Sequence, residues 1–169
     1  PYVGAQLAVL AQASPPKDVP HDGAPVMPPL HGEAMTFDPV RGRIVAFGGV
    51  ADQTWLEGTW EWNDAAWYRA DAGAAAPALR SGHAMLYHPR DGAVYVFGGM
   101  HAPPVEQRCD AWRYADRIWE RVFDGPCMTE RTVNASLVFD TRARTMLLLE
   151  GPAVATQEGF DGFDEDEGL

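Results

Sequence analysis

The chain has 169 residues, of which 46% are hydrophobic and 11% aromatic, and its formal net charge is −11 at pH 7. This composition indicates a folded protein, and no run of about 20 apolar residues indicates a membrane span. The strong negative charge argues against a nucleic-acid partner, because binding to phosphates needs a basic surface.

Residues 1–30 are predicted to be an arm or linker ahead of the repeated part, and residues 5–10 within it are a candidate strand. The apolar run that starts at Val3 leads to an A-x-A pattern ending at Ala13, which is typical of a signal-peptidase site. No basic segment precedes this run. A retained strand or arm and a secretion signal are therefore both open.

The part that follows repeats itself. The segment FDPVRGRIVAFGG at 37–49 returns as YHPRDGAVYVFGG at 87–99, and a weaker copy, FDTRARTMLLLEG, covers 139–151. An aromatic cluster follows each strong copy, and its members recur 52 residues later (112 − 60): Trp60, Trp62 and Trp67 become Trp112, Tyr114 and Trp119. Self-similarity at a period of about 50 residues indicates a stack of one supersecondary unit.

The second unit divides into four short strands, at 83–88, 93–97, 110–114 and 118–122. The tight turn at 89–92 contains Gly92, and the first unit has the same turn at 39–42. The strands are continuous apolar runs, which indicates sheets covered on both faces. The sequence therefore predicts antiparallel four-stranded blades at 31–70 and 80–123 and a half blade at 133–151, followed by an acidic tail at 152–169.

The pattern H-A-M-x-Y, G-x-V-Y-V-F-G-G, D-x-W-x-Y and W, best developed from Arg80 to Trp119, resembles the kelch repeat. The resemblance implies an all-β fold of kelch-type β-propeller blades, with an incomplete ring because a ring needs about 4–8 blades. Three explanations stay open. The chain is a piece of a longer propeller, or several chains assemble one ring, or the blades form an open stack.

The glycine pairs and the aromatic residues have predicted roles in this arrangement. The pairs at 48–49 and 98–99 let the second strand end in a bend at which a side chain would strike the neighbouring blade. The Trp and Tyr side chains are predicted to fill the wedge between adjacent blades, each burying about 150–250 Å².

Cys109 and Cys127 are predicted to form a disulfide, because the fold of the third and fourth strands brings their loops to the same end of the blade. Two free or separately buried thiols are the alternative. A disulfide favours an extracellular or periplasmic location. The single lysine among 13 basic residues, Lys17, is typical of a GC-rich bacterial genome.

Loops at 50–57, 100–109 and 124–132 are predicted to carry the contacts with partners, since rigid blades position variable loops. The candidate binding residues are Trp55, Glu57, His101, Glu106 and Arg108. His83 and His88, at the two ends of one strand, are interpreted as packing residues. No catalytic set and no metal site is predicted. No cofactor is expected, and the only candidate ion is calcium at the acidic tail, whose simpler interpretation is a solvated segment.

The leading hypothesis is a non-enzymatic kelch-type propeller segment that acts as a rigid extracellular scaffold for interaction or assembly. Its partner would be another protein, or further copies or blades of the same assembly. Two alternatives are a fragment of a galactose-oxidase-like or sugar-active propeller enzyme, and a structural subunit whose blades are completed by another chain. The copper site of galactose oxidase has no counterpart that can be mapped onto this sequence.

Overall fold

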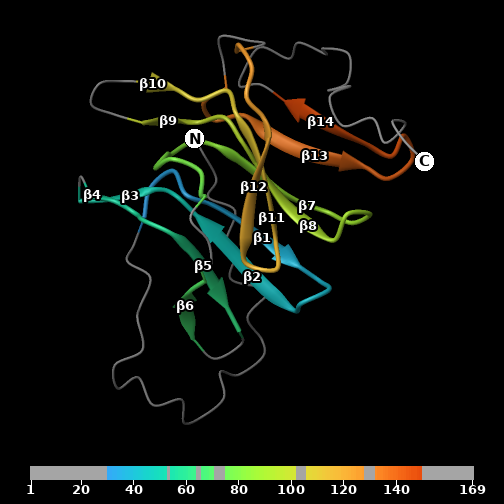
Figure 1. Ribbon diagram of the computed structural model, residues 1–169, viewed down its shortest axis with the longest axis horizontal. Helices are drawn as coiled ribbons and strands as arrows, with labels where there is room; N and C mark the ends of the chain where they lie inside the picture. Colours follow the sequence, from blue (N-terminus) through green and yellow to red (C-terminus); the bar gives the residue numbers. More distant parts are fainter. Residues whose placement is uncertain are drawn as a thin grey trace, which may run out of the picture.

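The computed structural model describes residues 30–52, 54–63, 66–70, 75–101, 106–127 and 132–149. The predicted arm strand at 5–10 and the acidic tail at 152–169 lie outside this part. Within it the fold is all-β, and its blade-like sheets fit an incomplete propeller (Figure 1).

Two four-stranded antiparallel sheets form the body. Sheet 1 has the order β1-β2-β5-β6, and sheet 2 has the order β7-β8-β11-β12. A third unit, hairpin 3, pairs β13 with β14. The strands of sheet 1 are β1 (Ala34–Asp38), β2 (Arg43–Phe47), β5 (Thr59–Trp62) and β6 (Trp67–Arg69). Those of sheet 2 are β7 (Ala84–His88), β8 (Ala93–Phe97), β11 (Ala111–Ala115) and β12 (Ile118–Phe123). Hairpin 3 consists of β13 (Ser136–Asp140) and β14 (Thr145–Leu149).

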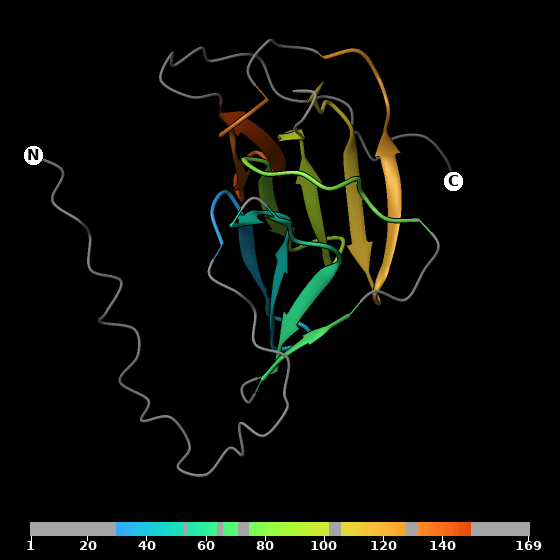
Figure 2. The ribbon, with the colours of Figure 1, turned by 90° about the vertical axis from the view of Figure 1, so that its left-hand side faces the viewer.

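The observed strands confirm the four predicted for the second unit to within a residue at each end. The turns are also as predicted, since Gly42 and Gly92 take the positive φ values of 62° and 59°. In the first turn the Asp38 carboxylate accepts hydrogen bonds from the backbone N–H groups of Val40 and Arg41. Strand β7 lies beside both β1 and β13 (Figure 2), whereas no comparable packing joins β6 to β12, so the sheets are arranged like neighbouring blades.

The glycine pairs form the seams between units. Gly49 donates its N–H to the carbonyl of Arg80 (2.9 Å), and Gly99 donates to that of Thr132 (2.9 Å). A Cβ added at Gly48 would overlap the Arg80 carbonyl, and one at Gly98 would lie 2.6 Å from that of Thr132. The predicted clash with the neighbouring blade is confirmed for the first glycine of each pair. The second glycine is instead crowded by its own sheet.

The aromatic cluster of sheet 2 fills the space between the two sheets, as predicted. Trp112, Tyr114 and Trp119 are 8%, 0% and 4% exposed and pack in one core with Val45 and Phe47 of sheet 1. The Trp119 ring lies 5.2 Å from that of Phe47. Because these side chains reach across the seam, the two sheets share one hydrophobic core.

The corresponding cluster of sheet 1 has no such cover among the described residues. Trp60, Trp62 and Trp67 are only half-buried, and the rings of Trp62 and Trp67 pack on each other at 5.8 Å. On β1, Met35 and Phe37 are 49% and 56% exposed. The same sequence pattern is thus buried in sheet 2 and open in sheet 1.

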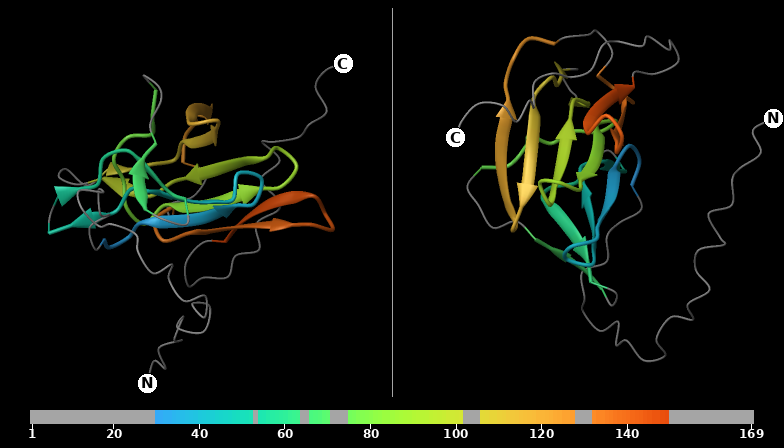
Figure 3. Two further views of the ribbon diagram at one scale, coloured as in Figure 1. Left: turned by 90° about the horizontal axis from the view of Figure 1, so that it is seen from below. Right: turned by 90° about the vertical axis from the view of Figure 1, so that its right-hand side faces the viewer.

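On its other side sheet 2 packs against hairpin 3. Tyr95 and Met146 share a second hydrophobic cluster, with Phe139 packed against it. Views from below and from the opposite side (Figure 3) show β13 and β14 as the last layer of the stack. In the described part of the chain β13 is the only strand that pairs with β14, so the outer edge of β14 is open.

Candidate functional site

The loops that follow the glycine pairs are short hairpins, which the sequence did not predict. They are β3 (Val50–Ala51) with β4 (Thr54–Trp55), and β9 (Met100–His101) with β10 (Glu106–Gln107). The base of each is closed by an equivalent hydrogen bond, Leu56 N–H to Gly49 O (3.0 Å) and Arg108 N–H to Gly99 O (2.8 Å). Both hairpins project at the left of Figure 1, so they lie at the same end of the two sheets.

The structure brings the predicted binding residues together in pairs. The ring of Trp55 lies 4.7 Å from that of His101, with an interplanar angle of 39°, so the two hairpins touch across the seam. Glu106 and Arg108 form an ion pair at 2.9 Å. The third predicted loop, 124–132, is described only at 124–127 and at Thr132.

A cavity of about 300 Å³ lies beside Trp55, and Glu57 also lines it. Two further lining residues, Trp60 and Arg69, were not predicted as binding residues, although they are register partners on β5 and β6. The Arg69 guanidinium lies 3.9 Å from the Glu57 carboxylate. Two indole rings beside an exposed ion pair are suited to bind a ligand or a peptide side chain through its apolar face, with polar groups fixing its orientation.

A buried carboxylate lies in the seam between sheets 1 and 2, toward the end opposite the hairpins. Glu61, on β5, is 0% exposed and accepts hydrogen bonds from Arg41 Nη1 (2.7 Å), Tyr68 OH (2.6 Å) and Tyr114 OH (2.9 Å). Burial and this carboxylate raise the pKa of both tyrosines, so they stay protonated donors. Burial alone would lower the pKa of Arg41, but its bonds to Asp38 and Glu61 raise it above the usual value.

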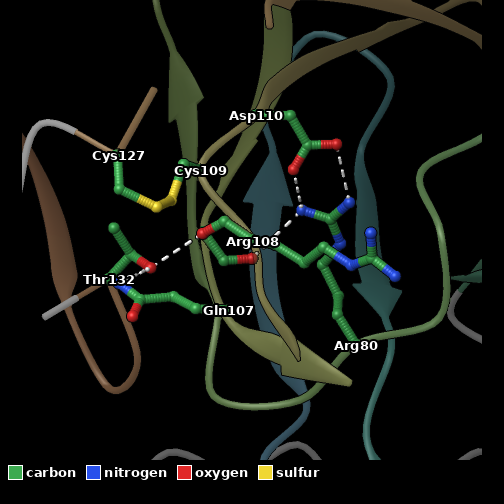
Figure 4. Close-up of a disulfide and its surroundings, with 8 residues drawn as sticks. Arg80, Gln107, Arg108, Cys109, Asp110, Cys127 and Thr132 are labelled. Atoms are coloured by element: carbon green, nitrogen blue, oxygen red, sulfur yellow. Dashed lines mark hydrogen bonds and ion pairs between the residues drawn. A yellow bond between two sulfur atoms is a disulfide. The ribbon is translucent and has the colours of Figure 1, made fainter. Parts of the chain in front are cut away.

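A second buried ion pair and a disulfide hold the base of the β9–β10 hairpin (Figure 4). Arg80, which is 0% exposed, donates to both carboxylate oxygens of Asp110, at 2.8 and 3.0 Å. Burial raises the pKa of Asp110, but the bonds from Arg80 and Trp112 outweigh it, so the net shift is downward. The predicted disulfide is present, with the Cα atoms of Cys109 and Cys127 4.9 Å apart.

His83 and His88 occupy the two seams. The ring of His88 packs at 4.6 Å against Phe139 of hairpin 3, and its Nδ1 accepts the backbone N–H of Asp91. The ring of His83 packs edge-on against Phe47 of sheet 1 at 5.6 Å, and both of its nitrogens are buried, with the backbone of Phe47 as the polar group beside them. Burial, reinforced by the positive charge of Arg80, lowers the pKa of His83 to about 3. These contacts support the interpretation of both histidines as packing residues.

Within the described residues no group of three or more His, Cys, Asp or Glu side chains is placed to hold a metal ion. The predicted calcium candidate, in the acidic tail, lies outside them. The same part of the chain contains no helix long and apolar enough to cross a membrane. Neither the known protein-family models nor the curated protein sequences give a match to this chain.

Proposed function

We propose that this chain is a segment of a kelch-type β-propeller that serves as a rigid, non-enzymatic scaffold for interaction and assembly, outside the cytoplasm. The observation that carries the proposal is that, among the described residues, nothing covers the aromatic face of sheet 1 and no strand pairs with the outer edge of β14. Further support for the kelch assignment comes from the glycine pairs and the aromatic cluster of sheet 2, which lie at the seams between units as a propeller needs.

The first open side is the aromatic face of sheet 1. Trp62 and Trp67 stand at the repeat positions of Tyr114 and Trp119, which are 0% and 4% exposed in sheet 2. In sheet 2 these two positions are buried because sheet 1 covers them. A half-buried tryptophan pair at the same positions favours a further blade as its partner.

The second open side is the edge of β14. Strands β2 and β8 pair on their outer edges with β5 and β11, whereas β14 has no such partner among the described residues. Unpaired backbone N–H and C=O groups on a strand edge accept an added strand. This edge favours the candidate in which another chain, or another part of a longer chain, completes the third blade.

The hairpin end would carry contacts with other proteins. Trp55 and Glu57 beside the cavity, together with His101, Glu106 and Arg108, are the residues proposed to bind such a partner. The Cys109–Cys127 disulfide supports an extracellular or periplasmic location, where disulfides persist.

The test is the mass of the particle in solution, measured by light scattering over a range of concentrations. We expect association beyond the 18.5 kDa of one chain, and we expect Trp67→Glu to abolish it while the sheets stay folded by circular dichroism. Val40→Glu is the matched control, because Val40 is 76% exposed but lies in the turn between β1 and β2, on neither the aromatic face of sheet 1 nor the edge of β14. A folded 18.5 kDa monomer at every concentration would refute completion by further copies.

A further inference from the structure

A second cavity, of about 430 Å³, lies between the sheets at the end opposite the hairpins, where the β1–β2 and β11–β12 turns meet. All five of its lining residues are charged: Arg41, Arg43, Glu61, Asp116 and Arg117. Sheet 1 supplies the first three and the β11–β12 turn supplies the other two. The cavity therefore exists only because the two sheets are packed together.

The buried carboxylate in this cavity does not need all three arginines. Glu61 already accepts hydrogen bonds from Arg41 and from two tyrosines, so both of its oxygens are satisfied. Arg41 in turn is fixed by Asp38, which accepts from its Nε at 2.6 Å. The Nη2 atom of Arg41 is nevertheless buried and makes no hydrogen bond.

Neither Arg43 nor Arg117 is hydrogen-bonded to Glu61, although Arg117 Nη2 donates to the hydroxyl of Tyr68 at 3.3 Å. Their Nε atoms lie 3.9 and 4.0 Å from Glu61 Oε2, beyond hydrogen-bond distance. Both guanidinium groups lie over the ring of Tyr68, with their centres 5.6 and 5.3 Å from its centroid. Their side chains are 32% and 49% exposed, so they remain accessible to a ligand. The tyrosine ring thus holds two like charges close together, and the carboxylate they share, Glu61, is hydrogen-bonded to other groups.

We propose that this cavity binds a small organic acid that also carries hydroxyl groups. A guanidinium fork matches the two oxygens of a carboxylate, and here two forks converge on one space. The carboxylate of Asp116, on the rim, is an acceptor suited to the hydroxyl groups of the same ligand. The volume lies within the range of small-molecule sites, about 300–1,000 Å³. This proposal is independent of the proposed scaffold function.

The experiment is isothermal titration calorimetry of the full chain at low salt with glucuronate as the probe. Glucose, which lacks the carboxylate, and acetate, which lacks the hydroxyl groups, are the matched ligands. We expect saturable binding of glucuronate with a Kd below about 1 mM, binding of acetate at least about 10-fold weaker, and none of glucose. We expect Arg43→Gln and Arg117→Gln each to weaken glucuronate binding at least about 10-fold, the loss of one charge-assisted contact.

Arg121→Gln is the control variant. Arg121, on β12, is 50% exposed, like Arg117, but it pairs with Asp124 and does not line the cavity. It should bind glucuronate as the unmodified chain does. Thermal unfolding of each variant checks that the fold is intact, which we expect because both substituted arginines are partly exposed. Absence of glucuronate binding, or equal binding by all variants, would overturn the site, and equal binding of acetate would overturn its hydroxyl specificity.

Discussion

Protonation of His83 should destabilise the packed sheets in mild acid. This imidazole is 5% exposed and lies against Phe47 across the seam, and a contact with the Phe47 backbone offsets its burial only in part. A charge there is unfavourable because it is buried, and because Arg80 carries the same sign nearby. The pKa of His83 is therefore about 3 in the folded chain, against 6.5 for an exposed histidine.

The sign and size of the effect follow from these two pKa values. Between pH 6.5 and about 3 the unfolded chain binds a proton at this position and the folded chain does not, so the free energy of unfolding falls as the pH falls. Above pH 6.5 both states are neutral and His83 has no effect. One pH unit corresponds to about 1.4 kcal/mol, so at pH 5 the loss from this single residue is about 2 kcal/mol.

The assay is urea unfolding followed by tryptophan fluorescence at pH 7, 6 and 5, on the chain and on His83→Gln. The variant cannot titrate at this position, so its free energy of unfolding should fall by about 2 kcal/mol less than that of the original chain between pH 7 and pH 5. His88→Gln, at the other end of β7, is the control variant. Its free energy of unfolding should still include the fall of about 2 kcal/mol that His83 causes between pH 7 and pH 5. Parallel pH profiles for the original chain and His83→Gln would refute this reasoning.

Three further predictions concern the seams. Gly98→Ala should lower the free energy of unfolding by more than about 3 kcal/mol, because its Cβ would overlap Thr132. Gly92 has a similar positive φ, but an added Cβ would have its nearest neighbour 3.9 Å away, so Gly92→Ala should lower it by only about 1 kcal/mol. Equal losses in urea unfolding would contradict the role of the seam. Replacing Cys109 and Cys127 by serine should cost about 3 kcal/mol, since the disulfide closes a loop of 18 residues, and reductant should shift the unfolding midpoint only of the original chain. Tyr114→Phe should lower the free energy of unfolding by about 2 kcal/mol, because the buried Glu61 carboxylate loses a hydrogen-bond donor. A loss below about 0.5 kcal/mol in thermal unfolding would show that Glu61 does not depend on this donor.

Much of the local structure could be predicted because it depends on residues close in the chain. The turn at 89–92 needs a positive φ at Gly92, and the strands on either side carry the apolar runs of a covered sheet. The disulfide was also predictable, since the turn after β11 brings Cys127 back toward Cys109. The predicted binding residues are only placed by the structure, and their role stays a prediction.

The charged cavity was not predicted, because its members come from positions at which the repeats differ. Glu61 occupies the position that is Arg113 in the second unit (113 − 61 is the offset of 52). A carboxylate between two tryptophans of a predicted strand was the available signal. A search for residues that agree between the repeats does not find it. Its partners Arg41 and Tyr114 lie 20 and 53 residues away, on different sheets.

The amino-acid sequence by itself determined the repeating unit, with its four strands, its glycine turns and its aromatic positions, because turn and strand preferences act over a few residues. Only the tertiary structure decided which of these units are covered. Trp62 and Tyr114 hold the same place in the repeat, yet the first is half-buried and the second is fully buried. Burial depends on the neighbour across the seam, and that neighbour is contributed by a distant part of the chain.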